Sequence, residues 1–354
     1  MSPDDQKSSP FGACPLPNES GDRILLGHGS GGLLTARLID ELLLPAFRNP
    51  VLEQLDDAAV LPVGDARVAL TTDSYVVTPI FFPGGDIGEL AVNGTVNDLA
   101  VSGARPVALS LAFILEEGLP LAHLRRVVES AREAATRAGV PIVTGDTKVV
   151  GHGSGDQIFI NTSGIGIVPP GVSLSSSNVR PGDAILLSGD IGDHGVAILA
   201  CREGLELEGD VASDTAPLHG LVTDVLTRSP GTHAMRDPTR GGLASVLVEI
   251  AKRQGLGIEI DERAIPISEV VRGACELLGL DPLLVANEGK LVAFVPEPQA
   301  DAALAAMRAH PLGRRAARIG RVTDAHPGVV VLGTSAFGQR IVDLPFAEPL
   351  PRIC

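Results

Sequence analysis

A four-residue turn in the first third of the chain places the strongest limit on its fold. Pro62-Val63-Gly64-Asp65 separates two apolar stretches, residues 58–61 and 67–72, which we predict to be strands. So short a connection joins antiparallel neighbours, because a parallel pair needs a crossover of a dozen or more residues. We therefore expect an α+β fold, with α/β alternation around it, which fits better than a doubly wound sheet.

Apolar periodicity then divides the chain into two halves that meet near Pro169-Pro170-Gly171. The first half contains predicted helices at 33–47, 90–101 and 121–138 and further strands at 140–143 and 158–168. The second half contains predicted strands at 184–187, 291–295 and 329–332 and helices at 196–201, 242–253 and 268–278. We expect a disordered leader at 1–22, an N-terminal domain at 23–168, a C-terminal α/β domain at 169–339 and a mobile tail at 340–354.

Charge and cysteine usage exclude several classes of protein. The formal net charge of −15 argues against a nucleic-acid partner, whose phosphates would repel the chain. The polar, acidic first ten residues are no secretory signal, and no apolar run reaches the roughly 20 residues that cross a bilayer. The four cysteines lack the paired spacing of a zinc site or a disulfide framework. We therefore expect a cytoplasmic protein without a membrane partner.

Carboxylates recur at the ends of the predicted strands of the first half. They lie in Asp56-Asp57, Thr71-Thr72-Asp73, Asn97-Asp98 and Gly145-Asp146-Thr147-Lys148. Each one singly is typical of a turn former or a helix cap. Together they favour a Mg²⁺–nucleotide site, because Mg²⁺ takes oxygen ligands and is completed by substrate phosphates.

Glycine-rich segments offer weaker support for a nucleotide site. Gly27-His28-Gly29-Ser30-Gly31-Gly32 precedes a helix and suits phosphate, although a flexible connection is an equal alternative. In Asp237-Pro238-Thr239-Arg240-Gly241-Gly242, Arg240 could bind phosphate, and Gly241 lets the backbone approach a ligand. A purely structural cap fits the same residues. In Asn287-Glu288-Gly289-Lys290, Glu288 and Lys290 flank a glycine turn. Taken alone, this pattern is typical of a solvated pair of opposite charges.

The chain ends on a thiol, in Pro351-Arg352-Ile353-Cys354. Prolines at 345, 349 and 351 favour an extended arm over a helix. Such an arm suits a side chain that receives a group at one site and delivers it to another. The alternative is a frayed terminus whose last residue happens to be cysteine.

Taken in order, these segments resemble the HypE family of hydrogenase-maturation proteins, within the PurM-like superfamily related to aminoimidazole ribonucleotide synthetase. The acidic motifs indicate only the superfamily, whereas the terminal Pro-Arg-Ile-Cys is specific to the family. The resemblance covers nearly the whole chain beyond about residue 22 and implies a two-domain protomer that forms a homodimer by packing of the N-terminal sheets.

The resemblance further implies an ATP-dependent enzyme, a lyase. The thiol of Cys354 would receive a carbamoyl group from the carbamoyltransferase HypF and be dehydrated to a thiocyanate. The cyano group would pass to iron held by a HypC–HypD complex, as a cyanide ligand of [NiFe]-hydrogenase. Glu288 and Lys148 would act beside Cys354, with Glu288 abstracting the proton. Mg²⁺ would be held by Asp57, Asp73, Asp98 and Asp146, and ATP also by Asn97, Arg240 and Gly241.

Two other functions remain open at this stage. Another PurM-like ligase, kinase or selenophosphate synthetase would share the aspartate motifs but would not need Cys354. A carrier or scaffold would use the tail for docking but would not need Lys148 and Glu288.

Overall fold

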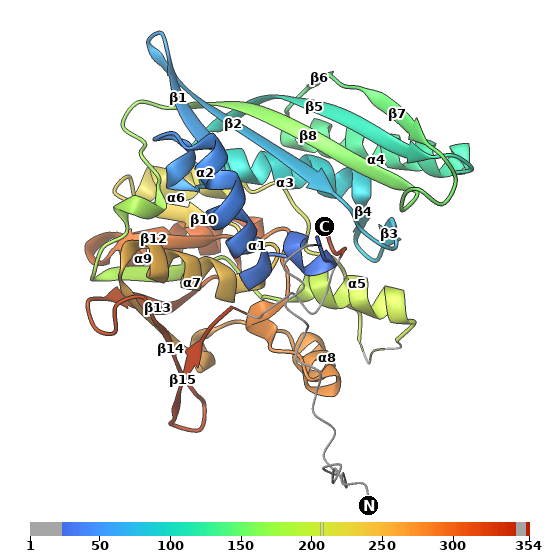
Figure 1. Ribbon diagram of the computed structural model, residues 1–354. Helices are drawn as coiled ribbons and strands as arrows, with labels where there is room; N and C mark the ends of the chain where they lie inside the picture. Colours follow the sequence, from blue (N-terminus) through green and yellow to red (C-terminus); the bar gives the residue numbers. More distant parts are fainter. Residues whose placement is uncertain (1–22, 206, 208, 345–351) are drawn as a thin grey trace, which may run out of the picture.

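The computed structural model describes residues 23–344, apart from Glu206 and Glu208, together with Arg352, Ile353 and Cys354. The expected leader at 1–22 and residues 345–351 of the expected tail lie outside the described residues. Two large sheets lie one above the other, with helices between them and around them (Figure 1). The end of the chain at Cys354 lies between the two sheets (Figure 1).

The N-terminal sheet is mixed. Its strand order is β1-β2-β8-β5-β6, with β7 also paired to β5. Strand β5 is antiparallel to β8 but parallel to β6 and β7. The antiparallel pairing of β1 with β2 across the turn is the one expected from Pro62 to Asp65, and the mixed sheet confirms the α+β expectation. The strands are β1 (Ala59–Val63), β2 (Ala66–Tyr75), β5 (Arg105–Glu116), β6 (Ile142–Thr144), β7 (Thr147–Val150) and β8 (Ile158–Val168).

Helices α3 (Ile87–Val101) and α4 (Leu121–Ala138) cover one face of this sheet. The carboxylate of Asp86 caps α3 by accepting hydrogen bonds from the backbone N–H groups of Gly88 and Glu89. Helix α3 is buried on almost every side because it lies between its own sheet and the C-terminal domain. Its small residues allow this close packing. A two-stranded ribbon, β3 (Phe81–Phe82) and β4 (Gly85–Asp86), precedes it.

The opposite face of the N-terminal sheet is open and apolar. Residues that alternate with the buried ones along β2 and β8 point away from the helices. The exposed large side chains of this sheet include Leu70, Val107, Ile114, Ile165 and Ile167. A contiguous apolar face of this kind usually marks an interaction surface.

The C-terminal domain has a seven-stranded sheet in the order β10-β12-β9-β13-β11-β14-β15. Helix α7 packs on the face that carries Ile185 and Leu187, and α6 and α9 pack on the face that carries Ala184 and Leu186. Strand β9 is thus buried on both faces, which explains its uninterrupted apolar sequence. The elements are β9 (Asp183–Leu187), α6 (His219–Arg228), β10 (Ala234–Arg236), α7 (Gly242–Gln254), β11 (Gly257–Asp261), β12 (Val292–Pro296), α9 (Glu297–Ala309), β13 (Ala317–Thr323), β14 (Val330–Gly333) and β15 (Gln339–Val342).

Two further helices, α5 (Asp193–Glu203) and α8 (Glu269–Leu278), lie beside the end of the chain. The helix expected at 33–47 is α1 (Leu33–Leu38) and α2 (Leu44–Phe47), joined by a π-helical turn (Ile39–Leu43). Strand β15 pairs with β14, so the C-terminal sheet extends into the first residues of the stretch expected as a tail.

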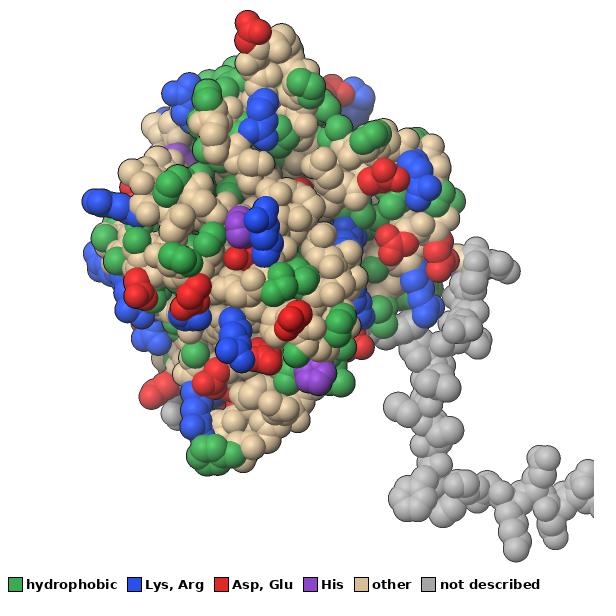
Figure 2. All heavy atoms as spheres, turned by 90° about the vertical axis from the view of Figure 1, so that its left-hand side faces the viewer, with side chains coloured by type: hydrophobic (Ala, Val, Ile, Leu, Met, Phe, Trp, Pro, Cys, Tyr) green, Lys and Arg blue, Asp and Glu red, His purple; other side chains and the backbone are tan. Residues whose placement is uncertain are grey.

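In the part of the chain that the structure describes, no helix is long and apolar enough to cross a membrane. On the face shown in Figure 2, lysine and arginine side chains are interspersed with aspartate and glutamate. The described residues of this face therefore form a surface of mixed charge.

Candidate functional site

Five carboxylates from five segments gather where the two domains meet. Asp57 precedes β1, Asp73 lies on β2 and Asp98 lies on α3. Asp237 and Glu288 come from C-terminal loops before α7 and β12. Burial, followed by the charges of Asp237, Asp73 and Asp57, raises the pKa of Asp98. The structure thus brings together three of the four predicted metal ligands, Asp57, Asp73 and Asp98.

Asp237 is a member of this cluster that sequence reasoning missed. In the sequence, Asp237 itself suggested only a helix cap. In the structure, burial and the nearby Asp57 raise the pKa of Asp237 to about 8, against the opposing effect of Arg236. Burial also raises the pKa of Asp57 to about 6, although Arg236 Nε lies 2.7 Å from Asp57 Oδ1 and lowers it. Buried like charges are costly unless a cation compensates them.

The carboxyl group of Glu288 lies deepest in the site. Burial, followed by the charges of Asp214, Asp237 and Asp73, raises its pKa well above the ordinary value. Its Oε1 atom is buried and has no hydrogen-bond partner. Its backbone N–H donates to Asp214 Oδ1 at 2.9 Å. A carboxyl group with a raised pKa is a stronger base than an ordinary glutamate once it is ionised.

A loop between α5 and α6 holds this part of the site in place. Asp214 Oδ2 lies 2.9 Å from Lys290 Nζ, and both side chains are buried. Burial alone would raise the pKa of Asp214, but Lys290 and His194 outweigh it and lower that pKa. The neighbouring Asn287-Glu288-Gly289-Lys290 turn is therefore no solvated pair, because Lys290 neutralises Asp214 inside the protein.

Asn97 joins the two domains from helix α3. Its Nδ2 donates to the backbone oxygens of Ala216 and Glu288, and its Oδ1 accepts from Leu218 N–H at 2.8 Å. These bonds use the polar groups of its side chain within the protein. Asn97 thus fastens the backbone of Glu288 to α3. Its contact with a cofactor stays a prediction.

The two glycine-rich segments pack on each other. Arg240 Nη1 donates to the carbonyl of Gly29 at 2.8 Å. Gly31 has φ +86°, and a side chain there would meet the Arg240 carbonyl. Gly241 also has positive φ, at the N-cap of α7, where an added Cβ would lie 2.0 Å from Ser245 Oγ. The glycine-rich segment 27–32 thus lies beside Arg240 and Gly241, at the N-terminus of α7.

Asp146 and Lys148 lie apart from this cluster within one chain. Lys148 Nζ forms an exposed ion pair with Asp146 Oδ2 at 2.7 Å. Lys148 is in register with Ile114, whose side chain is on the open face of the sheet. Lys148 is the main cause of the lowered pKa of Asp146, and none of the causes of that pKa shift comes from Asp57, Asp73 or Asp98.

The end of the chain is docked between the domains. Val76 N–H donates to the Cys354 carbonyl at 3.2 Å, and Thr78 N–H donates to the Arg352 carbonyl at 3.2 Å. On the other side, Arg202 Nη2 donates to the Arg352 carbonyl at 2.7 Å. Ile353 is buried, and Cys354 packs against the same apolar cluster as Tyr75. The last residue is therefore docked against the protein, with Ile353 buried and Cys354 half-buried.

His194 on α5 also holds the tail, and sequence reasoning missed it. Its Nε2 is 2.8 Å from the carbonyl oxygen of Ile353, and its Nδ1 is 2.7 Å from Ser213 Oγ. Burial lowers the pKa of His194, so the ring is neutral near pH 7. The sequence signal was present in Gly192-Asp193-His194-Gly195, which opens a helix directly after a glycine.

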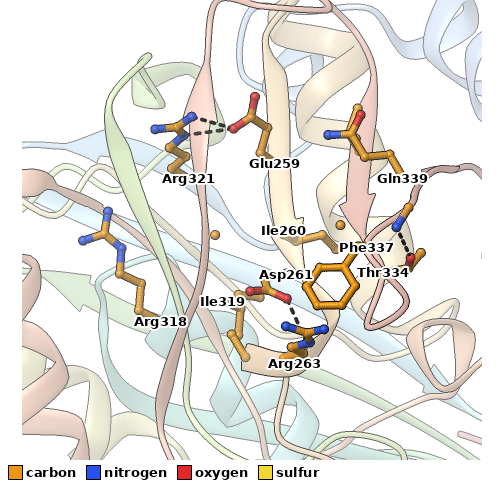
Figure 3. Close-up of a pocket in the computed structure, with 15 residues that line it drawn as sticks. Glu259, Ile260, Asp261, Arg263, Arg318, Ile319, Arg321, Thr334, Phe337 and Gln339 are labelled. Atoms are coloured by element: carbon orange, nitrogen blue, oxygen red, sulfur yellow. Dashed lines mark hydrogen bonds and ion pairs between the residues drawn. The ribbon is translucent and has the colours of Figure 1, made fainter.

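A separate hollow of about 860 Å³ lies on the outer part of the C-terminal sheet. In Figure 3 the guanidinium group of Arg263 lies beside the ring of Phe337, and Arg321 forms two hydrogen bonds with Glu259. Arg318 is likewise bound to Glu297. Arg318 and Arg321 are thus each paired with a glutamate, in contrast to the carboxylates that gather where the domains meet.

Comparison with known proteins agrees with this arrangement. Residues 55–168 match the AIR synthase related protein, N-terminal domain, and residues 180–333 match the corresponding C-terminal domain. The carbamoyl dehydratase HypE of Azotobacter vinelandii is 57% identical over 327 residues, which is 92% of this chain and 96% of that protein.

Two solved structures are similar along most of their length. A HypE–HypF complex contains a chain that is 49% identical, with a TM-score of 0.83, covering 87% of this chain and 99% of that one. A hydrogenase maturation protein HypE in complex with ATP is 51% identical, with a TM-score of 0.79, covering 94% of this chain and 100% of that one. The chain therefore belongs to the HypE carbamoyl dehydratase family, within the AIR synthase related proteins.

Proposed function

We propose that this protein uses ATP to dehydrate a carbamoyl group on its own Cys354 to a thiocyanate, which supplies cyanide ligands to the iron of [NiFe]-hydrogenase. The docked terminus carries this proposal. The Cys354 carbonyl accepts a hydrogen bond from Val76, directly after the strand that carries Asp73, and Asp73 in turn acts on the buried carboxyl group of Glu288. Relatives described as carbamoyl dehydratases support the same reaction.

The chemistry explains why ATP is needed. An amide oxygen is a poor leaving group, so the carbamoyl oxygen first attacks the terminal phosphorus of ATP, and ADP leaves. A base then removes one proton from nitrogen. Departure of phosphate, which carries the former carbonyl oxygen, breaks the C–O bond as the second proton is lost and the C≡N bond is completed. No oxidant or reductant is required.

Glu288 is our candidate for the proton-accepting group. Its unpartnered Oε1 and raised pKa suit a group that must take a proton from a weakly acidic amide nitrogen. Ile353 is buried beside Cys354, and shielding of the S-carbamoyl group from water would limit its hydrolysis.

ATP would bind next to the carboxylate cluster and the loops around Arg240 and Gly241. A HypE structure in complex with ATP supports ATP as the nucleotide. Mg²⁺ fits the donor set because Asp57 and Asp73 raise the pKa of the neighbouring Asp98 by charge repulsion, and a divalent cation would relieve that repulsion. It would also neutralise charge on the ATP phosphates. Among the described residues no three candidate side chains are already placed as ligands of one ion, so their closer approach is part of the proposal.

The proposed partners are HypF, which would load the carbamoyl group, and HypC–HypD, which would accept the cyano group. A solved HypE–HypF complex supports the first. A homodimer is supported by the open apolar face of the N-terminal sheet, with Leu70, Ile165 and Ile167. We also propose the cytoplasm as the location.

The roles proposed for Lys148 and Asp146 depend on this dimer. Both lie on the sheet face that a second copy would cover, away from their own chain's Glu288. Their action would then be on the partner's site. Mixed dimers of Lys148→Ala and Glu288→Gln protomers test this, because one intact site should restore part of the activity only if the two residues act across the interface.

A carrier without catalysis is the second candidate function, and the docked tail is the observation in its favour. The test is the mass of the C-terminal peptide after incubation with HypF, carbamoyl phosphate and ATP. A carbamoyl adduct on Cys354 that then loses the mass of one water establishes dehydration. A stable adduct with no ATP turnover identifies a carrier.

A further inference from the structure

Three buried polar atoms beside the docked terminus have no hydrogen-bond partner. They are Tyr75 Oη on β2, Asn93 Oδ1 on α3 and Glu288 Oε1. Their residues are 2%, 0% and 3% exposed. The Thr95 hydroxyl lies close to Tyr75 but is already engaged with Ala91 and Thr162. Buried polar groups are nearly always paired, so three such atoms near one another indicate a missing ligand.

The contacts of these residues place them around one region. A Cβ on Gly94 would lie 2.2 Å from Tyr75 Oη, so the phenol oxygen touches α3 next to Asn93. Asn93 Nδ2 donates to Thr215 Oγ1 at 3.1 Å. Thr215 follows Asp214, whose Oδ1 accepts from Glu288 N–H at 2.9 Å. One turn along α3, Asn97 holds the Glu288 carbonyl.

The terminal residue reaches the same region. Val76, which follows Tyr75, donates its N–H to the Cys354 carbonyl at 3.2 Å. Cys354 also packs against the apolar cluster that contains Tyr75 and Ile353. Cys354 is thus held by its backbone next to Tyr75 and packs in the same apolar cluster.

The three atoms match the hydrogen-bonding groups of a primary carboxamide. Such a group has one carbonyl oxygen, which accepts, and two N–H bonds, which donate. The site offers one donor, the Tyr75 hydroxyl, and two acceptor oxygens, Asn93 Oδ1 and Glu288 Oε1. An unmodified thiol is a weak donor and cannot satisfy all three.

Resting on the function proposed above, we infer that Tyr75 and Asn93 bind the carbamoyl group of Cys354 together with Glu288. Tyr75 orients the carbonyl oxygen, and Asn93 accepts one N–H while the other points at Glu288. Tyr75, the single tyrosine of the chain, is then a substrate-contacting residue. The arrangement selects a carboxamide over a carboxylate, because a carboxylate would face two acceptors without a proton to donate.

Tyr75→Phe tests this inference, since it removes only the hydroxyl. The full-length variant is incubated with HypF, carbamoyl phosphate and ATP, and the mass of its C-terminal peptide is followed over time for the carbamoyl adduct and for the subsequent loss of one water. We expect unchanged loading and ATP affinity, with dehydration slowed on the order of tenfold, the effect of losing one hydrogen bond in the transition state. Thr232→Val is the control, because it removes a buried hydroxyl that is already bonded within its own turn.

Asn93→Ala supplies a second, binding readout. With isotopically labelled nitrogen in the carbamoyl group, the wild-type N–H protons should exchange slowly with solvent deuterium, and the variant should lose this protection. The inference is overturned if Tyr75→Phe dehydrates at the wild-type rate and the carbamoyl N–H protons of Asn93→Ala exchange as slowly as those of the wild type. The proposed function would then remain intact. A wild-type adduct that never loses water overturns the proposed function and the inference with it.

Discussion

The Nε2 atom of His194 lies 2.8 Å from the carbonyl oxygen of Ile353 and ties the last peptide of the chain to helix α5. A carbonyl can only accept, so Nε2 carries the hydrogen and Nδ1 accepts from the Ser213 hydroxyl at 2.7 Å. Ser213 precedes Asp214, which binds the backbone of Glu288. His194, Ser213 and Asp214 thus connect the docked terminus to Glu288, the proposed base.

Removing this hydrogen bond should loosen the tail. In His194→Ala we expect Cys354 to react with a thiol reagent about five times faster than in the wild type, because one neutral hydrogen bond contributes about 1 kcal/mol. The rate of modification of the C-terminal peptide measures this. His233→Ala is the matched control, since His233 bonds Asp183 far from the tail. Equal rates in His194→Ala and the wild type would contradict the role of His194 as a fastening.

The same histidine makes stability depend on pH. Burial lowers the pKa of His194 in the folded state, opposed by Asp214 and the Ile353 carbonyl, so the unfolded chain binds the proton more readily. Its contribution to stability is full above about pH 6.5, the unfolded value, and is lost as the pH falls below that. Urea unfolding at about pH 7.5 and 5.5 should show a smaller decrease in His194→Gln than in the wild type. An identical decrease would exclude His194 as the source.

Glu288→Gln should stop the reaction after loading. The amide of glutamine cannot take a proton, so dehydration should slow by on the order of a hundredfold or more, and the carbamoylated form should accumulate. Mass measurement of the C-terminal peptide detects it. Glu259→Gln, an exposed residue paired with Arg321, serves as the control and should dehydrate normally. Normal turnover in Glu288→Gln would remove Glu288 from the mechanism.

Asp98→Asn should separate stability from nucleotide binding. Burial and the charges of Asp237, Asp73 and Asp57 raise the pKa of Asp98, so its neutral replacement should stabilise the metal-free protein by about 1–2 kcal/mol. Mg²⁺–ATP binding should weaken at the same time, because one acceptor for the cation is lost. Denaturant unfolding and calorimetric titration measure the two effects. The exposed Asp301→Asn should change neither, and a less stable Asp98→Asn protein would contradict the repulsion argument.

A charge on the open sheet face should prevent dimer formation. Ile165→Asp places a carboxylate at the centre of that apolar face, and burial of an unpaired charge there is strongly unfavourable. We expect a monomer by light scattering coupled to size-exclusion chromatography. Leu277→Asp makes the same change at an exposed leucine on α8 and should leave the oligomeric state unchanged. If the Ile165→Asp protein is still a dimer, the dimer does not form through this sheet face.

Local patterns were enough to predict many elements of this protein. The predicted helix at 121–138 and strand at 158–168 coincide with α4 and β8, because each has a strong period and a clear end. Strand β5 was missed, since its nearly continuous apolar run has no period of two that separates strand from buried helix. Helices α6 and α9 were missed as well, because each buries only three residues: Leu221, Val222 and Val225 in α6, and Ala300, Ala303 and Met307 in α9.

The sequence by itself determined which chemistry-bearing motifs exist and, through the terminal Pro351-Arg352-Ile353-Cys354, the family to which they point. Only the tertiary structure decided which of them meet. Packing of one domain on the other brings Asp237 and Glu288 to Asp73 and Asp98, while strand order places Lys148 on the opposite face of the sheet. The physical reason is that contacts between distant segments are set by how sheets and helices pack, and no local pattern encodes that choice.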